Sequence, residues 1–352
     1  MSNSPFKFLN AYQKEDVDFF FGREKETEDL YEMTYDTRLM VIVGASGTGK
    51  TSIVQCGLAN KFKETRWNDI FIRRADNINT SIHEELDKEL HETGGSEMGD
   101  AQSVFDKLDY IYRSTFKPIY LIFDQFEELF IVNPNKEEQE DFFQLIDKII
   151  ESPISCKVLL IMRDEFITHL WEYEKTIPTL FDHRYRIERM RSSKMEEVIV
   201  STLQKHHEKL VIQAGERDAI ATNIINALTE SKAGLELTYL QVFLDRLFQE
   251  AEQNAERPPL FTPQLVEKMG ALEDVIGEFL SAQIANLEEQ LGPGKKGIPI
   301  RLLGAMITDE KTKKVLTDED LERLRTQLNI SAEELQLCIQ SFQNMRILKQ
   351  FD

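Results

Sequence analysis

The segment GASGTGKT at residues 44–51 has the residue types and the spacing that bind a chain of phosphates. It fits the pattern G-x-x-x-x-G-K-[ST], in which glycines let the backbone wrap closely around phosphate oxygens. The lysine brings a positive charge to the outer phosphates, and the final hydroxyl is a ligand for Mg²⁺. The positions predicted to bind a nucleotide here are Gly44, Ser46, Gly47, Thr48, Gly49, Lys50, Thr51 and Ser52.

A group of carboxylates follows the apolar run at 119–123. In a P-loop ATPase a second strand lies beside the strand that precedes the phosphate loop, and its terminal Asp holds Mg²⁺. We therefore predict Asp124 and Thr51 as the metal ligands. A nearby glutamate then orients or deprotonates the attacking water. Glu127 is the first choice because it lies one turn after Asp124 if a helix starts here, and Glu128 stays open. The structural alternative is a set of helix N-terminal carboxylates in solvent.

A further polar strand end comes from the run KVLLIM at 157–162, which is followed by Arg163. In ATPases with an added central strand, the polar end of that strand senses the γ-phosphate. The permanent charge and forked shape of an arginine suit this role. The alternative is an arginine that pairs with Asp164 or Glu165 at the start of a helix.

The elements that must position these residues alternate between apolar strands and amphipathic helices up to about residue 190. This alternation is typical of a parallel α/β sheet that is covered on both faces. The expected strands are 38–43, 68–74, 119–123, 157–162 and an edge strand at 184–190, and the expected helices lie near 80–92, 100–115 and 136–151.

From about residue 191 helical periodicity dominates, with a long helix expected at 271–291 and a linker, LGPGKKG, at 291–297. The predicted fold class is therefore α/β, a P-loop NTPase sheet of the ASCE or AAA+ type, followed by an all-α helical domain and a winged-helix domain. The predicted domains are an N-terminal segment at 1–20, a nucleotide-binding domain at 21–190, a helical domain at 191–291 and a winged helix at 298–352.

Composition limits the other partners. The chain has 352 residues, a net charge of −20 and a pI near 4.9, which disfavours non-specific binding to nucleic acid or anionic membranes. It has no run of about 18 apolar residues and no signal-peptide pattern, so we expect a cytoplasmic protein without a membrane span. We expect Cys56, Cys156 and Cys338 in the core, Trp67 and Trp171 in the core or an interface, and His206 and His207 in solvent.

Several stretches in this order resemble the STAND ATPases, most closely the bacterial "novel STAND" group. They are FFGREKETEDL, GASGTGKTSIVQCGL, LIFDQFEELF, VLLIMRDEF and LELTYLQVFLDRLF. The resemblance covers about residues 20 to 350. It implies a signalling switch that ADP holds closed and that ATP, with a ligand sensed elsewhere, allows to oligomerise.

The resemblance also assigns roles to residues. Gly22 and Arg23 would lie beside the adenine of ATP or ADP, Asp124 would bind Mg²⁺, Glu127 would be catalytic and Arg163 would sense the γ-phosphate. Two departures stand out. Thr238 replaces the proline that packs on the base in many relatives, and no histidine follows Cys338. We therefore expect the winged helix to be truncated and the chain to be a fragment, with an unknown sensor or effector elsewhere.

Four functions are compatible with these patterns. The first is a STAND-type switch with slow ATP hydrolysis and regulated homo-oligomerisation in signalling or antiviral defence. The alternative is an origin-recognition-like loader or motor ATPase that acts on DNA or protein. A small-molecule kinase and a nucleotide-dependent scaffold without hydrolysis are the remaining two.

Overall fold

The computed structural model describes residues 4–8, 10–63, 66–94, 103–131, 134–229, 236–253, 258–270, 272–292, 294–307, 314 and 316–344. It divides into two compact units. The first, here called the sheet unit, comprises residues 11–198. The second, the helical unit, comprises residues 1–10 together with 199–352.

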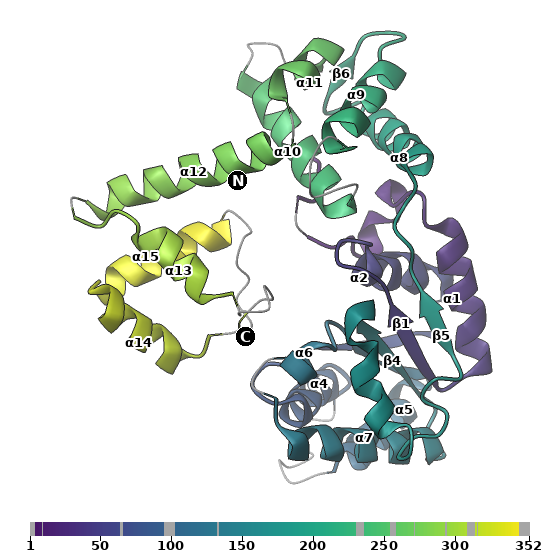
Figure 1. Ribbon diagram of the computed structural model, residues 1–352. Coiled ribbons are helices and arrows are strands. Elements are labelled where there is room, and N and C mark those ends of the chain that lie inside the picture. Colours follow the sequence, from purple (N-terminus) through teal and green to yellow (C-terminus); the bar gives the residue numbers. More distant parts are fainter. Residues whose placement is uncertain are drawn as a thin grey trace. The chain divides into compact units, whose positions relative to one another are not determined.

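The sheet unit is built on a five-stranded parallel sheet in the order β2-β3-β4-β1-β5, and Figure 1 labels three of these strands, β4, β1 and β5. The strands are β1 (Leu39–Val43), β2 (Asn68–Ile72), β3 (Ile119–Phe123), β4 (Cys156–Met162) and β5 (Arg184–Arg186). The parallel α/β sheet of the P-loop type is confirmed. One expectation was wrong, since β3 does not lie beside β1: the added central strand β4 separates them, because it pairs with both.

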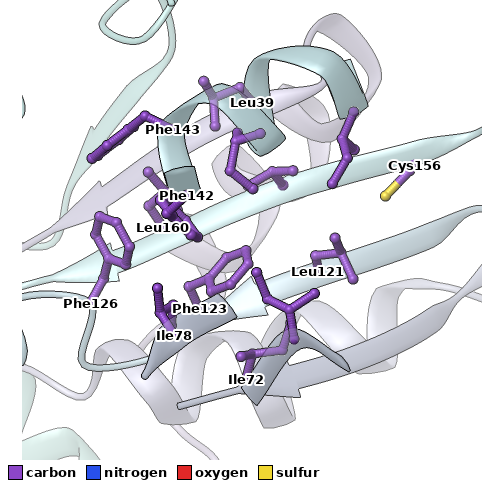
Figure 2. Packing of buried hydrophobic residues seen from close by; sticks show 14 of the residues in the cluster. Leu39, Ile72, Ile78, Leu121, Phe123, Phe126, Phe142, Phe143, Cys156 and Leu160 are labelled. Carbon is purple, nitrogen blue, oxygen red and sulfur yellow. The ribbon is translucent and has the colours of Figure 1, made fainter. Parts of the chain in front are cut away.

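Both faces of the sheet are buried, as the near-continuous apolar strands require. Alternate residues point to opposite faces, so Leu121 and Phe123 join one core while Tyr120 and Ile122 join the other. Figure 2 shows the first core, where the ring of Phe142 lies 5.0 Å from that of Phe123, measured between centroids.

Helices cover both faces. One core takes residues from α4 (Ile78–Glu92), α5 (Val104–Thr115), α6 (Glu128–Ile131) and α7 (Lys136–Glu151), and the other from α1 (Glu24–Asp36) and the helix after the phosphate loop. That helix consists of α2 (Lys50–Ser52), a π-helical stretch η2 (Ile53–Leu58) and α3 (Ala59–Lys61). Asn77 and Asn135 cap α4 and α7 by accepting bonds from backbone N–H groups of the first turn. Two 3₁₀ segments, η1 (Lys14–Phe19) and η4 (Asp164–Tyr173), complete the unit, and α8 (Ser192–Lys205) begins in it.

The helical unit contains one short parallel pair of strands, β6 (Val211–Ile212) and β7 (Leu260–Phe261). Its helices are α9 (Arg217–Thr229), α10 (Leu237–Gln253), α11 (Pro263–Met269), α12 (Leu272–Leu291), α13 (Ile298–Ala305), α14 (Asp318–Leu328) and α15 (Ala332–Asn344). The amino-terminal residues belong to this unit, because Phe6 is buried beside the rings of Phe248 and Phe261.

The carboxy-terminal segment has a core of its own from α12, α13, α14 and α15. The winged helix expected at 298–352 stays a prediction, because residues 308–313 and 345–352 lie outside the described residues. No helix in the described part of the chain combines the length and the apolar character that crossing a membrane requires.

Other sequence expectations have mixed outcomes. The three cysteines are free and buried, as expected, and Trp67 is buried. His206 was wrongly assigned to solvent, since it is only 6% exposed. Trp171 is 62% exposed and is therefore not a core residue.

Candidate functional site

The phosphate loop joins the end of β1 to the start of α2 and depends on its glycines. Gly47 and Gly49 have φ values of 72° and 85°, in the left-handed region that disfavours other residues. A Cβ on Gly44 would lie 2.6 Å from the carbonyl oxygen of Ile187, closer than real contacts allow. The loop therefore has the close backbone wrap that a polyphosphate requires, and it opens onto the N-terminus of a helix.

Lys50 lies across this loop. Its Nζ donates hydrogen bonds to the carbonyl oxygens of Gly44 at 2.8 Å and Ala45 at 2.9 Å. Burial lowers the pKa of the Lys50 ammonium, and the negative charges of Glu127 and Asp124 oppose that shift. The site thus holds a partly desolvated cation under the influence of two carboxylates, and a phosphate group would be attracted to that cation.

Thr51 and Asp124 are in direct contact. The Thr51 hydroxyl donates to Oδ1 of Asp124 at 2.8 Å, and the Asp124 side chain is 2% exposed. Its second oxygen, Oδ2, accepts from Arg73, whose Nε lies 3.1 Å away. Ser52 contacts the amino-terminal segment: its Oγ accepts a hydrogen bond from the backbone N–H of Tyr12 at 3.1 Å.

Glu127 and Glu128 follow a sharp turn after β3. Gln125 has a φ of 57°, and the next residue, Phe126, donates its N–H to the carbonyl of Ile161 in β4. This turn sends Phe126 into the core (Figure 2) and leaves Glu127 buried at the sheet edge. Helix α6 begins only at Glu128, so the expectation of a helix starting at Asp124 was wrong.

The buried Glu127 carboxylate is held by Arg163, the residue after β4. Arg163 donates through Nε to Oε1 at 3.0 Å and through its backbone N–H to Oε2 at 3.2 Å. Its Nη1 lies 3.3 Å from a carboxylate oxygen of Glu165. Glu165 was expected from the sequence as a partner of Arg163, whereas Glu127 was not.

Arg23 contacts the back of the phosphate loop. It is buried, and its Nη2 donates to the carbonyl oxygens of Thr48 at 2.9 Å and Glu188 at 3.0 Å. Gly22 has a φ of 82°, and a Cβ there would lie 2.4 Å from Val198. The adenine contact expected at these two positions stays a prediction, and the Arg23 guanidinium holds backbone carbonyls.

The residues present fit a magnesium nucleotide. A hydroxyl, a buried carboxylate and an ammonium lie at a glycine-rich loop, in which a Cβ on Gly44 would collide with the carbonyl oxygen of Ile187. Mg²⁺ prefers oxygen ligands, and it is usually held by one or two carboxylates together with the phosphates of the substrate. Thr51 and Asp124 would hold the ion, and Lys50 would meet the phosphates.

Arg73 was not among the predicted site residues. The only signal for it was its place near the end of the strand predicted over 68–74, since the carboxyl ends of parallel strands meet at one edge. The observed strand β2 already ends at Ile72, so Arg73 lies just beyond it. The run FIRR contains two arginines, and the second, Arg74, has a different role: it forms a buried bidentate pair with Glu138 at 2.8 and 2.9 Å. The sequence alone could not separate the two.

Residues 5–350 match the family model described as Novel STAND NTPase 1. No curated protein matches the chain significantly.

Solved structures with a similar fold include the ORC2 protein of Aeropyrum pernix in ADPNP–ADP complexes. It shares 14% identity at a TM-score of 0.57, and the match covers 96% of this chain and 100% of that chain. A Walker-type ATPase of Pyrococcus abyssi shares 15% identity at a TM-score of 0.53, covering 94% of this chain and 93% of that chain. The ORC1 protein of A. pernix in complex with DNA shares 14% identity at a TM-score of 0.50, covering 92% and 84%. At these identities the likeness concerns the fold alone.

Proposed function

Because the chain belongs to the novel STAND NTPase family, we propose that it is a switch that binds ATP or ADP with Mg²⁺, hydrolyses ATP slowly and assembles into a homo-oligomer in its ATP state. The proposal rests on one observation above all. Lys50, Thr51 and Asp124 meet at the carboxyl edge of one parallel sheet, and the charge of Glu127 acts on the same lysine. A role in signalling or antiviral defence, with an unknown sensor or effector, is part of this proposal.

Each residue then has a defined task. The N–H groups at the start of α2 and the Lys50 ammonium bind the phosphates. Thr51 keeps its oxygen lone pairs for the metal because its proton is donated to Asp124. When bound, Mg²⁺ supplies Lewis-acid polarisation of the phosphate oxygens. Glu127 orients a water and takes up its proton.

The contacts of Glu127 support slow turnover. Both of its oxygens accept hydrogen bonds from Arg163, so a water must compete with these donors for the carboxylate. An arginine that exchanges Glu127 for a γ-phosphate oxygen would free the carboxylate only when ATP is present. This is how Arg163 could serve as a sensor of the γ-phosphate.

The alternative proposal is a loader or motor that acts on DNA or protein. Its support is the fold shared with the ORC proteins of A. pernix, one of them solved with DNA. The net charge of −20 weighs against a DNA-binding face. Hydrolysis that duplex DNA stimulates at physiological salt would favour this alternative over the switch.

The test is nucleotide binding. We expect nucleotide to copurify with the protein, and Lys50→Ala to weaken binding of a fluorescent ATP analogue by about 100-fold, since a partly buried charge contact is lost. Lys88→Ala is the matched control, because Lys88 is exposed on α4 and pairs only with Glu85 at 3.1 Å in the described part of the chain. Unchanged affinity in the Lys50 variant would refute the site.

A further inference from the structure

Arg73 faces the proposed metal carboxylate because of strand register. In the β2–β3 pair, Ile72 lies opposite Phe123, so the next residues, Arg73 and Asp124, leave the sheet at the same level. The Arg73 guanidinium donates through Nε at 3.1 Å, and through a second nitrogen, to Oδ2 of Asp124. The strand register therefore places the two residues that make this contact side by side.

The two oxygens of Asp124 have different neighbours. The Thr51 hydroxyl on Oδ1 is compatible with a metal, because a hydroxyl that donates its proton still offers lone pairs. The Arg73 fork on Oδ2 is a permanent positive charge, which attracts the carboxylate and repels Mg²⁺. Asp124 is 2% exposed and Arg73 is 27% exposed, so water screens this pair only in part.

We propose that Arg73 is a positioning residue that acts as the resident counter-ion of Asp124 and thereby sets how much Mg²⁺ adds to nucleotide binding. The proposal rests on the proposed nucleotide site. Mg²⁺ and Arg73 share one buried carboxylate, so the ion binds more weakly than it would at Asp124 and Thr51 alone. Removing the charge of Arg73 while keeping a donor to Oδ2 therefore strengthens the contribution of Mg²⁺.

Arg73→Gln makes this change and Arg73→Lys preserves the charge. With a fluorescent ATP analogue held at saturation, Mg²⁺ is titrated from an EDTA-treated start and the half-saturating Mg²⁺ concentration is measured. We expect it to fall by about tenfold in Arg73→Gln, as loss of one partly screened unit charge predicts, and to stay within about twofold of wild type in Arg73→Lys. Arg113→Gln, which removes the same charge from an exposed pair on α5, should leave it unchanged.

The outcomes separate this inference from the proposed function. A wild-type protein that binds no nucleotide would refute both the proposed function and the role of Arg73. Normal nucleotide and Mg²⁺ binding in the wild type, with an unchanged or higher half-saturating Mg²⁺ concentration in Arg73→Gln, overturns the role of Arg73 and leaves the nucleotide site standing. If Arg73→Gln does not fold, the test rests on Arg73→Lys. A change of more than about threefold in its half-saturating Mg²⁺ concentration would mean that the forked shape of the arginine, and not its charge, sets the affinity for Mg²⁺.

Discussion

At the scale of single residues, the site depends on which of two adjacent glutamates reaches the sheet edge. Glu127 is 5% exposed and bonded to Arg163, whereas Glu128 is half-buried and starts α6. A general base must lie where its proton acceptor faces the reacting water. Glu127 is therefore our candidate for this base, because its charge acts on Lys50.

We predict that Glu127→Gln keeps nucleotide affinity and lowers turnover by about 100-fold or more, because the amide cannot accept the proton. Glu128→Gln should change turnover by less than about threefold. Single-turnover hydrolysis, measured beside equilibrium nucleotide binding, distinguishes the two. Normal turnover in the Glu127 variant would move the role to Glu128 or away from both.

The part of this site that lies in one continuous segment could be predicted from the sequence. The phosphate loop lies in one short segment, so its pattern identifies Lys50 and Thr51 directly. The Arg73–Asp124 contact depends on the register between β2 and β3, and the Glu127–Arg163 contact depends on a turn with Gln125 at a positive φ. Neither feature has a local sequence signature, so neither arginine contact could be predicted from the sequence.

At the scale of elements, the helix after the phosphate loop is unusual because its central stretch, η2, is π-helical. Such stretches are rare and are often found at functional sites. In η2, Gly57 packs against α1: a Cβ added there would lie 2.5 Å from Thr27 Oγ1 and 3.1 Å from the ring of Phe20. Thr27 and Phe20 thus fix the helix that carries Lys50 and Thr51.

This packing reverses the usual effect of glycine in a helix. Gly→Ala normally stabilises a helix by up to about 1 kcal/mol, but Gly57→Ala should lower the free energy of unfolding by about 1–3 kcal/mol through overpacking. Gly277→Ala in α12 is the control, since among the described residues a Cβ there meets nothing within 4 Å and should stabilise by up to about 1 kcal/mol. Urea unfolding measures both. Stabilisation in both variants would contradict the close contact.

His206, one residue after α8, gives a pH-dependent prediction. Burial lowers its pKa to about 4, and the ring of Phe6 lies 5.3 Å away between centroids. The unfolded chain, with a histidine pKa near 6.5, therefore binds a proton between pH 6.5 and 4 that the folded chain does not. Stability is full above that range and falls as the pH drops through it.

The measurement is urea unfolding at pH 7.5 and pH 5. We expect the wild type to lose about 1–2 kcal/mol more than His206→Gln over this interval, because the variant has no proton to take up. His207→Gln, at the exposed neighbouring position, should behave as wild type. Equal losses in the wild type and His206→Gln would show that this histidine is not responsible.

Elements that bury one face or both were predictable, because their periodicity follows from the hydrophobic effect. β3 and α7 lie where expected, at 119–123 and 136–151, whereas α5 begins at Val104 and not near residue 100. The burial of His206 was not predictable from its charged surroundings. It follows from packing against Phe6, 200 positions earlier in the chain.

At the scale of the whole molecule, the proposed switch needs nucleotide-dependent contacts at the phosphate loop to reach the rest of the chain. Within the sheet unit, Arg23 joins the carbonyl of Thr48 in the loop to that of Glu188, shortly before α8 begins. Ile187 donates its N–H to the carbonyl of Val43 at 2.8 Å. The segment at 187–188 is therefore fixed to both ends of the loop, and a loop that rearranges around a γ-phosphate would move it.

The final prediction is that the mass in solution depends on the nucleotide. Moving a two-state equilibrium from about 1:99 to 99:1 requires a differential affinity of about 5.5 kcal/mol. Hydrogen bonds to charged groups contribute about 1.5–3 kcal/mol each, so new γ-phosphate contacts from Lys50 and Arg163, with a further backbone contact, are of sufficient size. We expect a monomer with ADP and an oligomer with a non-hydrolysable ATP analogue in analytical ultracentrifugation, and a Lys50→Ala variant that stays monomeric in both. A wild type that binds both nucleotides but keeps one mass would leave the NTPase intact and remove the self-assembling switch.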